Sequence, residues 1–320
     1  MSVTRIPPKG EDGALPEVIC VVGPTASGKT SLGVNLAEKL GGEVISADSM
    51  QIYKYMDIGT AKPTPEEMRG IPHHLIDFLE PSEEYSVVQY VQAAKKLIID
   101  ITDRGNVPVI VGGTGQYVSA LVNNICFDET ESDPALREYY TNIASERGNS
   151  YLHALLEEED PEAAAQIHEN NLKRVVRALE MRKLTGLTLS ARNEKSRLRP
   201  VFARYRVFGI DVDRAELYRR INLRVDNMIS EGLEDEVRRV LSMNPGRTAS
   251  QAIGYKEFVT YFAGSASLSE TVELIKKNSR NYAKRQLTWF RREPWVEWRT
   301  PDSILKAVIH NDVFPPDSSF

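Results

Sequence analysis

The sequence has little cysteine and no long apolar segment, and each absence excludes a class of protein. Its 320 residues contain two cysteines, too few for a disulfide framework or a cysteine-based zinc site. No apolar run approaches the roughly 20 residues that a membrane-spanning helix needs. The first 16 residues lack the apolar core of a signal peptide and are expected to form a flexible tail. We therefore expect a cytoplasmic protein that does not contact membranes.

Internal repeats and low-complexity tracts are also absent, which excludes solenoid and fibrous architectures. The composition, 41% hydrophobic and 27% charged, is typical of a globular protein. The length allows about two domains.

Positive charge is scarce except in two segments. Residues 171–224 hold 15 Lys/Arg against 5 Asp/Glu, and residues 276–299 hold 8 against 2, although the whole chain has a net charge of −5. Two basic segments on an acidic chain are compatible with a polyanionic partner larger than a nucleotide. They are equally compatible with solvated helix faces, so charge alone does not decide between the two.

The most informative segment is the octapeptide GPTASGKT, Gly23–Thr30, which satisfies the pattern GxxxxGK[ST]. Glycines in this pattern let backbone N–H groups surround an anion, and the helix that follows adds its positive end. Lys29 supplies a compact positive charge, and the Thr30 hydroxyl can bind Mg²⁺. The sequence therefore predicts a site for a diphosphate or triphosphate, for which ATP is the default ligand.

Apolar runs and helical periodicities alternate around this loop as they do in a parallel α/β sheet. Strands are expected at 18–22, 44–46 and 107–111, and an amphipathic helix at 86–103. Ligands of such sheets sit at the carboxyl ends of the strands. The glycine loop, Asp48 and Thr114 all fall there. Asp48 is compatible with a helix N-cap as well as with a functional carboxylate.

The character changes after about residue 128, where residues 134–190 show successive charged helices until a strand near 205–212. We therefore expect a core of 17–127 and 201–300, a helical insertion of 128–200 and a tail of 301–320. Apolar residues from Ile221 to Leu241 predict one long helix. A last basic helix precedes Trp289 and Phe290.

Several side chains allow two interpretations each. His73 and His74 suggest a metal, but no further His/Cys cluster accompanies them, which favours a structural role. Arg220 and Arg224 share a helix face, where they either reach a phosphate group or pair with Glu216. The remaining undecided residues are the aromatic pairs Tyr139-Tyr140 and Trp289-Phe290, which stack on bases or pack in the fold, and Asp57 and Lys62, whose roles the sequence does not assign.

Seven further strings carry a resemblance to a known family. They are DSMQIYKYMDIGTAKP (Asp48–Pro63), IPHHLIDF (Ile71–Phe78), GGTGQY (Gly112–Tyr117), DPALR (Asp133–Arg137), IHENNLKRVVRALE (Ile167–Glu180), SQAIGYKE (Ser250–Glu257) and KRQLTWFR (Lys284–Arg291). In this order, with GPTASGKT, they resemble the bacterial tRNA dimethylallyltransferases, or tRNA isopentenyltransferases, over about residues 17–293.

The resemblance implies a P-loop NTPase-like sheet with flanking helices and an inserted helical domain that binds tRNA. It implies a monomer that transfers a dimethylallyl group from dimethylallyl diphosphate to N6 of the adenosine 3′ of the anticodon. The tRNAs concerned read codons that begin with U. Mg²⁺ would be the cofactor, held by Thr30.

Matched residue by residue, the resemblance also implies roles in the site. Asp48 is the expected general base, with Thr25 and Lys29 as further catalytic residues. The diphosphate would be bound by Gly23, Pro24, Thr25, Ala26, Ser27, Gly28, Lys29, Thr30 and Arg224. The tRNA anticodon stem-loop would be contacted by Asp48, Ser49, Met50, Gln51, Thr114, Arg137, Lys173, Arg174, Arg177, Gln251, Gly254 and Lys256.

Three other functions share some of these features. An adenylate isopentenyltransferase, with a free nucleotide as acceptor, has the loop and the carboxylate but no use for the basic insertion or the DPALR string. A small-molecule kinase would use the loop for ATP. A non-enzymatic RNA-binding ATPase would not need Asp48 in the string DSMQ.

Overall fold

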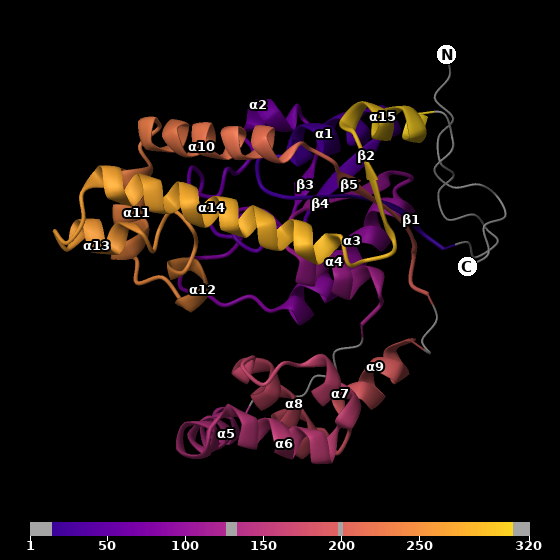
Figure 1. Cartoon of the computed structure of the whole chain (residues 1–320). Coiled ribbons are helices and arrows are strands. Elements are labelled where there is room, and N and C mark those ends of the chain that lie inside the picture. The colour runs from indigo at the N-terminus through magenta and orange to yellow at the C-terminus, as the bar shows by residue number, and fades with distance from the viewer. Residues whose placement is uncertain (1–14, 126–132, 198–200, 310–320) are drawn as a thin grey trace. The chain divides into compact units, whose positions relative to one another are not determined.

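The computed structural model describes residues 15–125, 133–197 and 201–309. Six parallel strands form one sheet in the order β3-β2-β4-β1-β5-β6 (Figure 1). Their bounds are β1 Glu17–Val22, β2 Gly42–Ser46, β3 His73–His74, β4 Val107–Gly112, β5 Arg204–Ile210 and β6 Val296–Arg299. The parallel α/β fold expected from the sequence is confirmed.

Strand β1 lies between β4 and β5, which explains its uninterrupted apolar sequence. Val18–Val22 is completely buried because a strand pairs with β1 on each side and both faces of the sheet are covered. Ile19 and Val21 face a core cluster shared with α1. Side chains alternate along a strand, so Cys20 points to the opposite face of the sheet. The strand before the phosphate loop is thus held on all sides.

The helices of the same unit as the sheet are α1 Lys29–Leu40, α2 Pro65–Met68, α3 Val87–Asp103, α4 Gly115–Val122, α10 Arg214–Ser230, α11 Leu233–Ser242, α12 Arg247–Ser250, α13 Phe258–Phe262, α14 Leu268–Phe290 and α15 Pro301–Ile309. Local sequence explains their ends. Gly28 precedes α1 with φ 90°, and Gly41 ends it with φ 63°, both conformations that glycine adopts freely. Ser86 and Gln89 form a capping box at the start of α3.

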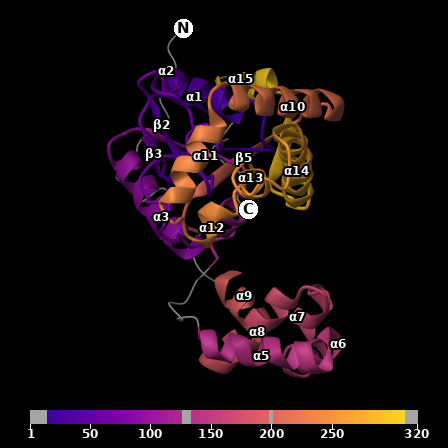
Figure 2. The same ribbon diagram turned by 90° about the vertical axis from the view of Figure 1, so that its left-hand side faces the viewer.

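The long helix expected from Ile221 to Leu241 is in fact two helices, α10 and α11. Gly232 between them has φ 97°, a left-handed conformation that ends α10 and redirects the chain. The apolar periodicity continues across the break because both helices bury residues in one cluster, among them Val225 and Val237. Helices α10 and α14 lie side by side in both views (Figures 1 and 2).

The segment after residue 300, expected to be a tail, begins with a packed helix. Ile304 and Val308 of α15 are buried in the same cluster as Leu32 and Leu36 of α1. Strand β6, which the sequence analysis did not predict, pairs with β5 and brings the chain to this position. The last part of the fold therefore completes one face of the sheet.

A second compact unit, Val122–Val201, interrupts the first, which holds the residues up to Leu121 and from Phe202 onward. It consists of α5 Pro134–Arg147, α6 Asn149–Glu159, α7 Pro161–Gln166, α8 Leu172–Thr185 and α9 Leu189–Arg197. These helices bury their own core, which includes Leu152, Leu156 and Leu179. No helix in the described ranges is both long and apolar enough to cross a membrane.

We predict that Ile304→Ala destabilises the first unit by about 2–5 kcal/mol, the usual range for truncating a buried isoleucine. Ile309→Ala on the same helix is the control, because that side chain is 43% exposed. Urea unfolding of both variants measures the difference. Equal stability of the two variants would contradict the packing of α15 into the core.

Candidate active site

The phosphate loop connects the buried end of β1 to the first turn of α1. Lys29, the first residue of α1, donates a hydrogen bond from Nζ to the carbonyl oxygen of Pro24 at 2.6 Å. Burial lowers the pKa of Lys29 to about 8, the Asp48 carboxylate opposes this shift, and Arg224 adds to it. A lysine ammonium that is partly stripped of water and close to an arginine is a binding site for an anion.

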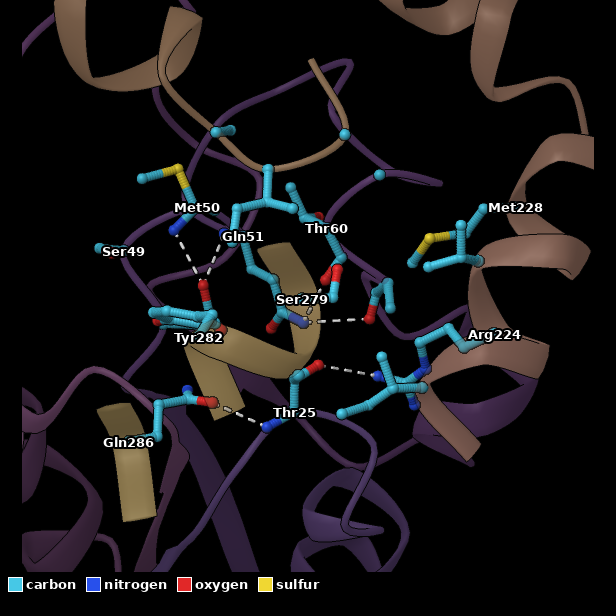
Figure 3. A pocket seen from close by; sticks show the side chains of 18 of the residues that line it. Thr25, Ser49, Met50, Gln51, Thr60, Arg224, Met228, Ser279, Tyr282 and Gln286 are labelled. Carbon is cyan, nitrogen blue, oxygen red and sulfur yellow. Dashed lines mark hydrogen bonds between the residues drawn. The ribbon is translucent and has the colours of Figure 1, made fainter. Parts of the chain in front are cut away.

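Gln286 of α14 holds the loop in place. Its Oε1 accepts a hydrogen bond from the Thr25 backbone N–H at 2.8 Å, and its Nε2 donates to the Gly113 carbonyl at 3.0 Å. The side chain is buried, and Figure 3 shows it directed at Thr25. One amide thus connects the phosphate loop to the glycine-rich end of β4. Gln286 lies in the string KRQLTWFR, but nothing in the sequence assigned it to the site.

Asp48 follows the end of β2, and its side chain is oriented by backbone N–H groups of the residues that follow it. Its Oδ1 accepts hydrogen bonds from the N–H groups of Met50 at 2.9 Å and Gln51 at 3.3 Å. This is the bonding of an N-cap, but the residues that follow form a turn and not a helix. Within the described ranges no hydrogen bond reaches Oδ2. One carboxylate oxygen is therefore fixed, and the other remains able to accept a proton.

Thr114, just after the end of β4, holds Ser49, the residue that follows Asp48 in the turn. Its Oγ1 accepts a hydrogen bond from the Ser49 backbone N–H at 2.9 Å. Tyr282 of α14 lies near Asp48 and Thr114, and burial raises the pKa of its hydroxyl. The ends of β2 and β4 are thus connected to α14 around Asp48.

These groups surround one cavity of about 310 Å³. Of the residues predicted for the site, Thr25, Lys29, Thr30, Asp48, Ser49, Met50, Gln51, Arg224, Gln251, Gly254 and Lys256 line it. Residues to which the sequence analysis assigned no role in the site also line it, namely Gly59, Thr60, Ala61, Val111, Gly112, Ile221, Val225, Met228, Ile275, Ser279, Tyr282, Arg285 and Gln286. The cavity therefore combines cationic, carboxylate and apolar walls.

A second cavity of about 490 Å³ lies against the outer side of the phosphate loop. It shares Lys29, Thr30 and Arg224 with the first cavity, and Ala26 and Gly28 line it as well. Gly23, Pro24 and Ser27 line neither cavity; Ser27 is buried, and Pro24 contributes its carbonyl to Lys29.

The structure separates the two arginines that share a face of α10. Arg224 lines both cavities and donates from Nη1 to the Thr25 hydroxyl at 3.4 Å (Figure 3). Arg220 donates to the Glu216 carboxylate at 2.6 Å and lines neither cavity. Burial lowers the pKa of Arg224, and the Glu67 carboxylate opposes this shift.

The residues around Thr30 suit a magnesium ion that is held mainly by phosphate. The described residues contain no group of three His, Cys, Asp or Glu side chains that could hold a metal. Magnesium does not require such a group, because it keeps several waters and binds through one or two oxygen ligands plus substrate phosphates. The Thr30 hydroxyl, beside Lys29 in both cavities, is an oxygen ligand of this kind.

In the helical unit, a buried carboxylate holds two of the predicted tRNA-binding arginines. Glu180 is fully buried, and its oxygens accept hydrogen bonds from Arg137 at 2.9 and 3.0 Å and from Arg177 at 2.6 Å. Hydrogen bonds from both arginines lower the pKa of Glu180 against the opposing effect of burial. Both arginine side chains remain nearly half exposed. Lys173 and Arg174, one turn earlier on α8, are exposed.

The other undecided residues have structural contacts. His74 is hydrogen-bonded to Glu43 at 2.6 Å, and His73 to the Ile71 carbonyl at 2.8 Å. Trp289 donates from Nε1 to Ser119 at 2.9 Å. The remaining contacts are those of Lys62 with Asp57 and Asp77, and of Tyr139 with the edge of Tyr140.

We predict that Lys29→Met raises the free energy of unfolding of the ligand-free protein at pH 7 by about 3 kcal/mol. Folding lowers the pKa of Lys29, so the unfolded chain binds more protons between about pH 8 and 10.5. The free energy of unfolding of the unmutated protein therefore rises in this window. The difference in this free energy between Lys29→Met and the unmutated protein shrinks by about 2 kcal/mol between pH 7 and 9.5.

Urea unfolding at the two pH values measures this gap, with Lys39→Met as the control because Lys39 is exposed on the same helix. A gap that is absent at pH 7, or that widens as the pH rises, would contradict the burial of a charged Lys29.

Similar proteins carry consistent names. The chain is 50% identical over 283 residues to a tRNA dimethylallyltransferase of Carboxydothermus hydrogenoformans, covering 88% of this chain and 91% of that protein. It is 51% identical over 283 residues to one of Geobacillus thermodenitrificans, covering 88% and 90%.

Solved structures extend the likeness to the fold. A tRNA isopentenylpyrophosphate transferase from Bacillus halodurans superposes with a TM-score of 0.68 at 43% identity, covering 92% of this chain and 95% of that one. A eukaryotic dimethylallyltransferase acting on tRNA superposes with a TM-score of 0.75 at 28% identity, covering 91% and 75%. The family model described as IPP transferase matches residues 51–293. The family resemblance seen in the sequence motifs is confirmed, and this chain belongs to the IPP transferase family.

Proposed function

We propose that this protein transfers a dimethylallyl group from dimethylallyl diphosphate to N6 of an adenosine in tRNA. The observation that carries the proposal is that a phosphate loop and an oriented carboxylate, Asp48, line one cavity. Relatives about 50% identical over most of this chain are named tRNA dimethylallyltransferase. The adenosine 3′ of the anticodon, in tRNAs that read codons beginning with U, is the proposed acceptor.

The acceptor nitrogen needs a base. The lone pair of N6 is delocalised into the adenine ring, so N6 is a poor nucleophile until its proton is taken. Asp48 accepts that proton on Oδ2 while its Oδ1 stays bonded to the backbone of Met50 and Gln51. The new bond joins N6 to C1 of the dimethylallyl group, and the bond from C1 to the diphosphate oxygen breaks.

The leaving diphosphate carries the charge that develops in this step. Lys29, the N–H groups of the loop and Arg224 surround its proposed position, and the Thr25 hydroxyl lies between them. Mg²⁺ held through Thr30 would add positive charge to the diphosphate oxygens. The apolar side chains of Ile221, Val225 and Met228 exclude water from the reacting carbon.

The helical unit supplies the proposed contacts to the anticodon stem-loop. Arg137 and Arg177 are held by Glu180, and Lys173 and Arg174 extend the same basic segment. These side chains neutralise backbone phosphates and carry no sequence information by themselves. The reacting adenine must leave its stack to enter the cavity, as bases do in other base-modifying enzymes. A monomeric state and a cytoplasmic location remain predictions.

The identity of the molecule that accepts the dimethylallyl group distinguishes this function from its alternatives. The protein would be incubated with Mg²⁺ and labelled dimethylallyl diphosphate plus either tRNA or AMP, with ATP alone as the control. We expect label in tRNA only. Label in AMP but never in tRNA would show an adenylate isopentenyltransferase instead, and phosphoryl transfer from ATP would show a kinase.

We predict that Asp48→Asn lowers kcat by about 10²–10⁴-fold, the usual contribution of a general base. The amide oxygen still accepts the hydrogen bonds from Met50 and Gln51, so affinity for tRNA should stay within a few fold. Single-turnover rates and filter binding measure the two quantities. Asp103→Asn, on the exposed end of α3, is the control. Near-normal turnover of Asp48→Asn would exclude Asp48 as the base.

We predict that Arg177→Ala weakens tRNA binding and reduces the slope of log K against log salt concentration by about one. Arg182→Ala on the same helix removes an equal charge, but Arg182 is paired with Glu159 and is not a predicted contact. Binding titrations between low and moderate salt compare the two variants. If both variants change the slope equally, or neither does, Arg177 is not part of the tRNA interface.

A further inference from the structure

Glu236 is a buried carboxylate outside every motif used so far, and it makes four hydrogen bonds. It lies in the first turn of α11 and is 4% exposed. Its Oε2 accepts from the backbone N–H groups of Asp57 at 2.9 Å and Ile58 at 2.8 Å. Its Oε1 accepts from the Gly59 N–H at 2.8 Å and from the Tyr255 hydroxyl at 2.6 Å.

These bonds connect two segments that line the cavity. The first, loop 57–61 (Asp57–Ala61), contributes Gly59, Thr60 and Ala61 to its wall. The second, loop 251–256 (Gln251–Lys256), contributes every one of its residues except Tyr255. Almost 200 residues of sequence separate the two loops, and one carboxylate bonds to both.

The two loops also touch directly, in a way that requires a glycine. A Cβ at Gly59 would lie 2.5 Å from Cε2 of the Tyr255 ring, closer than any side chain tolerates. Tyr255 is completely buried, and both burial and the Glu236 carboxylate raise the pKa of its hydroxyl. The hydroxyl therefore keeps its proton and donates a hydrogen bond to Glu236 at any ordinary pH.

The far side of loop 57–61 is held by a residue of the proposed acceptor site. Gln51 donates from Nε2 to the carbonyls of Thr60 at 3.2 Å and Ala61 at 3.0 Å. The position of Gln51, whose backbone N–H bonds to the Asp48 carboxylate, thus depends on the loop that Glu236 holds. None of the hydrogen bonds of Glu236 reaches the phosphate loop.

Stability alone does not explain why a carboxylate is buried at this position. Burying a carboxylate costs several kcal/mol, and apolar residues of similar size commonly replace buried charges without loss of stability. Three successive N–H groups aimed at one carboxylate instead form an anion nest, which fixes the conformation of a backbone segment.

Resting on the proposed function, we propose that Glu236 is a positioning residue that fixes loop 57–61 against loop 251–256 and thereby shapes the cavity wall for the tRNA acceptor. It takes no part in proton transfer or in binding the diphosphate. Replacing Glu236 should therefore lower kcat/KM for tRNA, the acceptor, and leave the binding of dimethylallyl diphosphate, the donor, unchanged.

The test compares Glu236→Gln with Glu234→Gln. The first variant keeps the size of the side chain but turns an amide N–H group toward backbone N–H donors. The second changes a partly exposed carboxylate of the same turn, which pairs with Arg238. Hydrogen–deuterium exchange of the two loops and steady-state kinetics with tRNA and dimethylallyl diphosphate are measured for both.

We expect Glu236→Gln to speed exchange in both loops and to lower kcat/KM for tRNA by about 10–100-fold, as small misplacements near a reacting centre do. The KM for dimethylallyl diphosphate should stay within about twofold, because the contacts of the phosphate loop remain. Glu234→Gln should behave as the unmutated protein. Unchanged exchange in Glu236→Gln, or an equal rise in both KM values with faster exchange throughout the sheet, would overturn the proposal.

If Glu236→Gln does not fold, Tyr255→Phe decides, because it removes only one of the four hydrogen bonds. Faster exchange in loop 251–256 together with a lower kcat/KM for tRNA supports the proposal, and exchange and kinetics like those of the unmutated protein overturn it. A failure of the unmutated protein to label tRNA would instead contradict the proposed function, while the exchange experiment would still report on the loops.

Discussion

The anchored phosphate loop is the constraint on which the rest of the site depends. Strand β1 is buried between β4 and β5, so the loop that follows it leaves the sheet at a fixed point. Gln286 then ties the Thr25 N–H to the Gly113 carbonyl, which places the end of β4 and the helix α14 around the same point. A cradle for an anion is costly to assemble at the moment of binding, and here the protein has assembled it in advance.

The cavity next to this cradle is lined by groups of both charges. Lys29 and Arg224 suit the departing diphosphate of the proposed reaction, and the Asp48 carboxylate, which opposes the shift in the pKa of Lys29, suits the loss of a proton from the nucleophile. Apolar side chains of α10, such as Val225 and Met228, line the wall. A phosphoryl transfer would use the cations and a carboxylate but has no need of the apolar wall. Together they suit alkyl transfer, in which an uncharged carbon moves from an anionic leaving group to a weak nucleophile.

The sequence predicted the elements whose signals are local, and it missed those that arise from tertiary contacts. The buried run of β1, the capped helix α3 and the glycine loop were recognisable because pattern and turn chemistry agree within a few residues. The apolar periodicity predicted one helix across Gly232 because α10 and α11 pack into one cluster. The left-handed conformation of Gly232 instead separates them into two helices. Gln286 and Glu236 act on segments far away in the chain, and no local pattern distinguishes such residues from ordinary core polar groups.

In the proposed function the phosphate loop holds the diphosphate of a prenyl donor and not ATP. Isothermal titration calorimetry in the presence of Mg²⁺ distinguishes the two, with a non-hydrolysable dimethylallyl thiodiphosphate and ATP as separate ligands. We expect the prenyl compound to bind at least about tenfold more tightly, because only its dimethylallyl group packs against the apolar wall beside Arg224 while its diphosphate occupies the anion cradle. Tighter binding of ATP would show that the loop holds ATP instead.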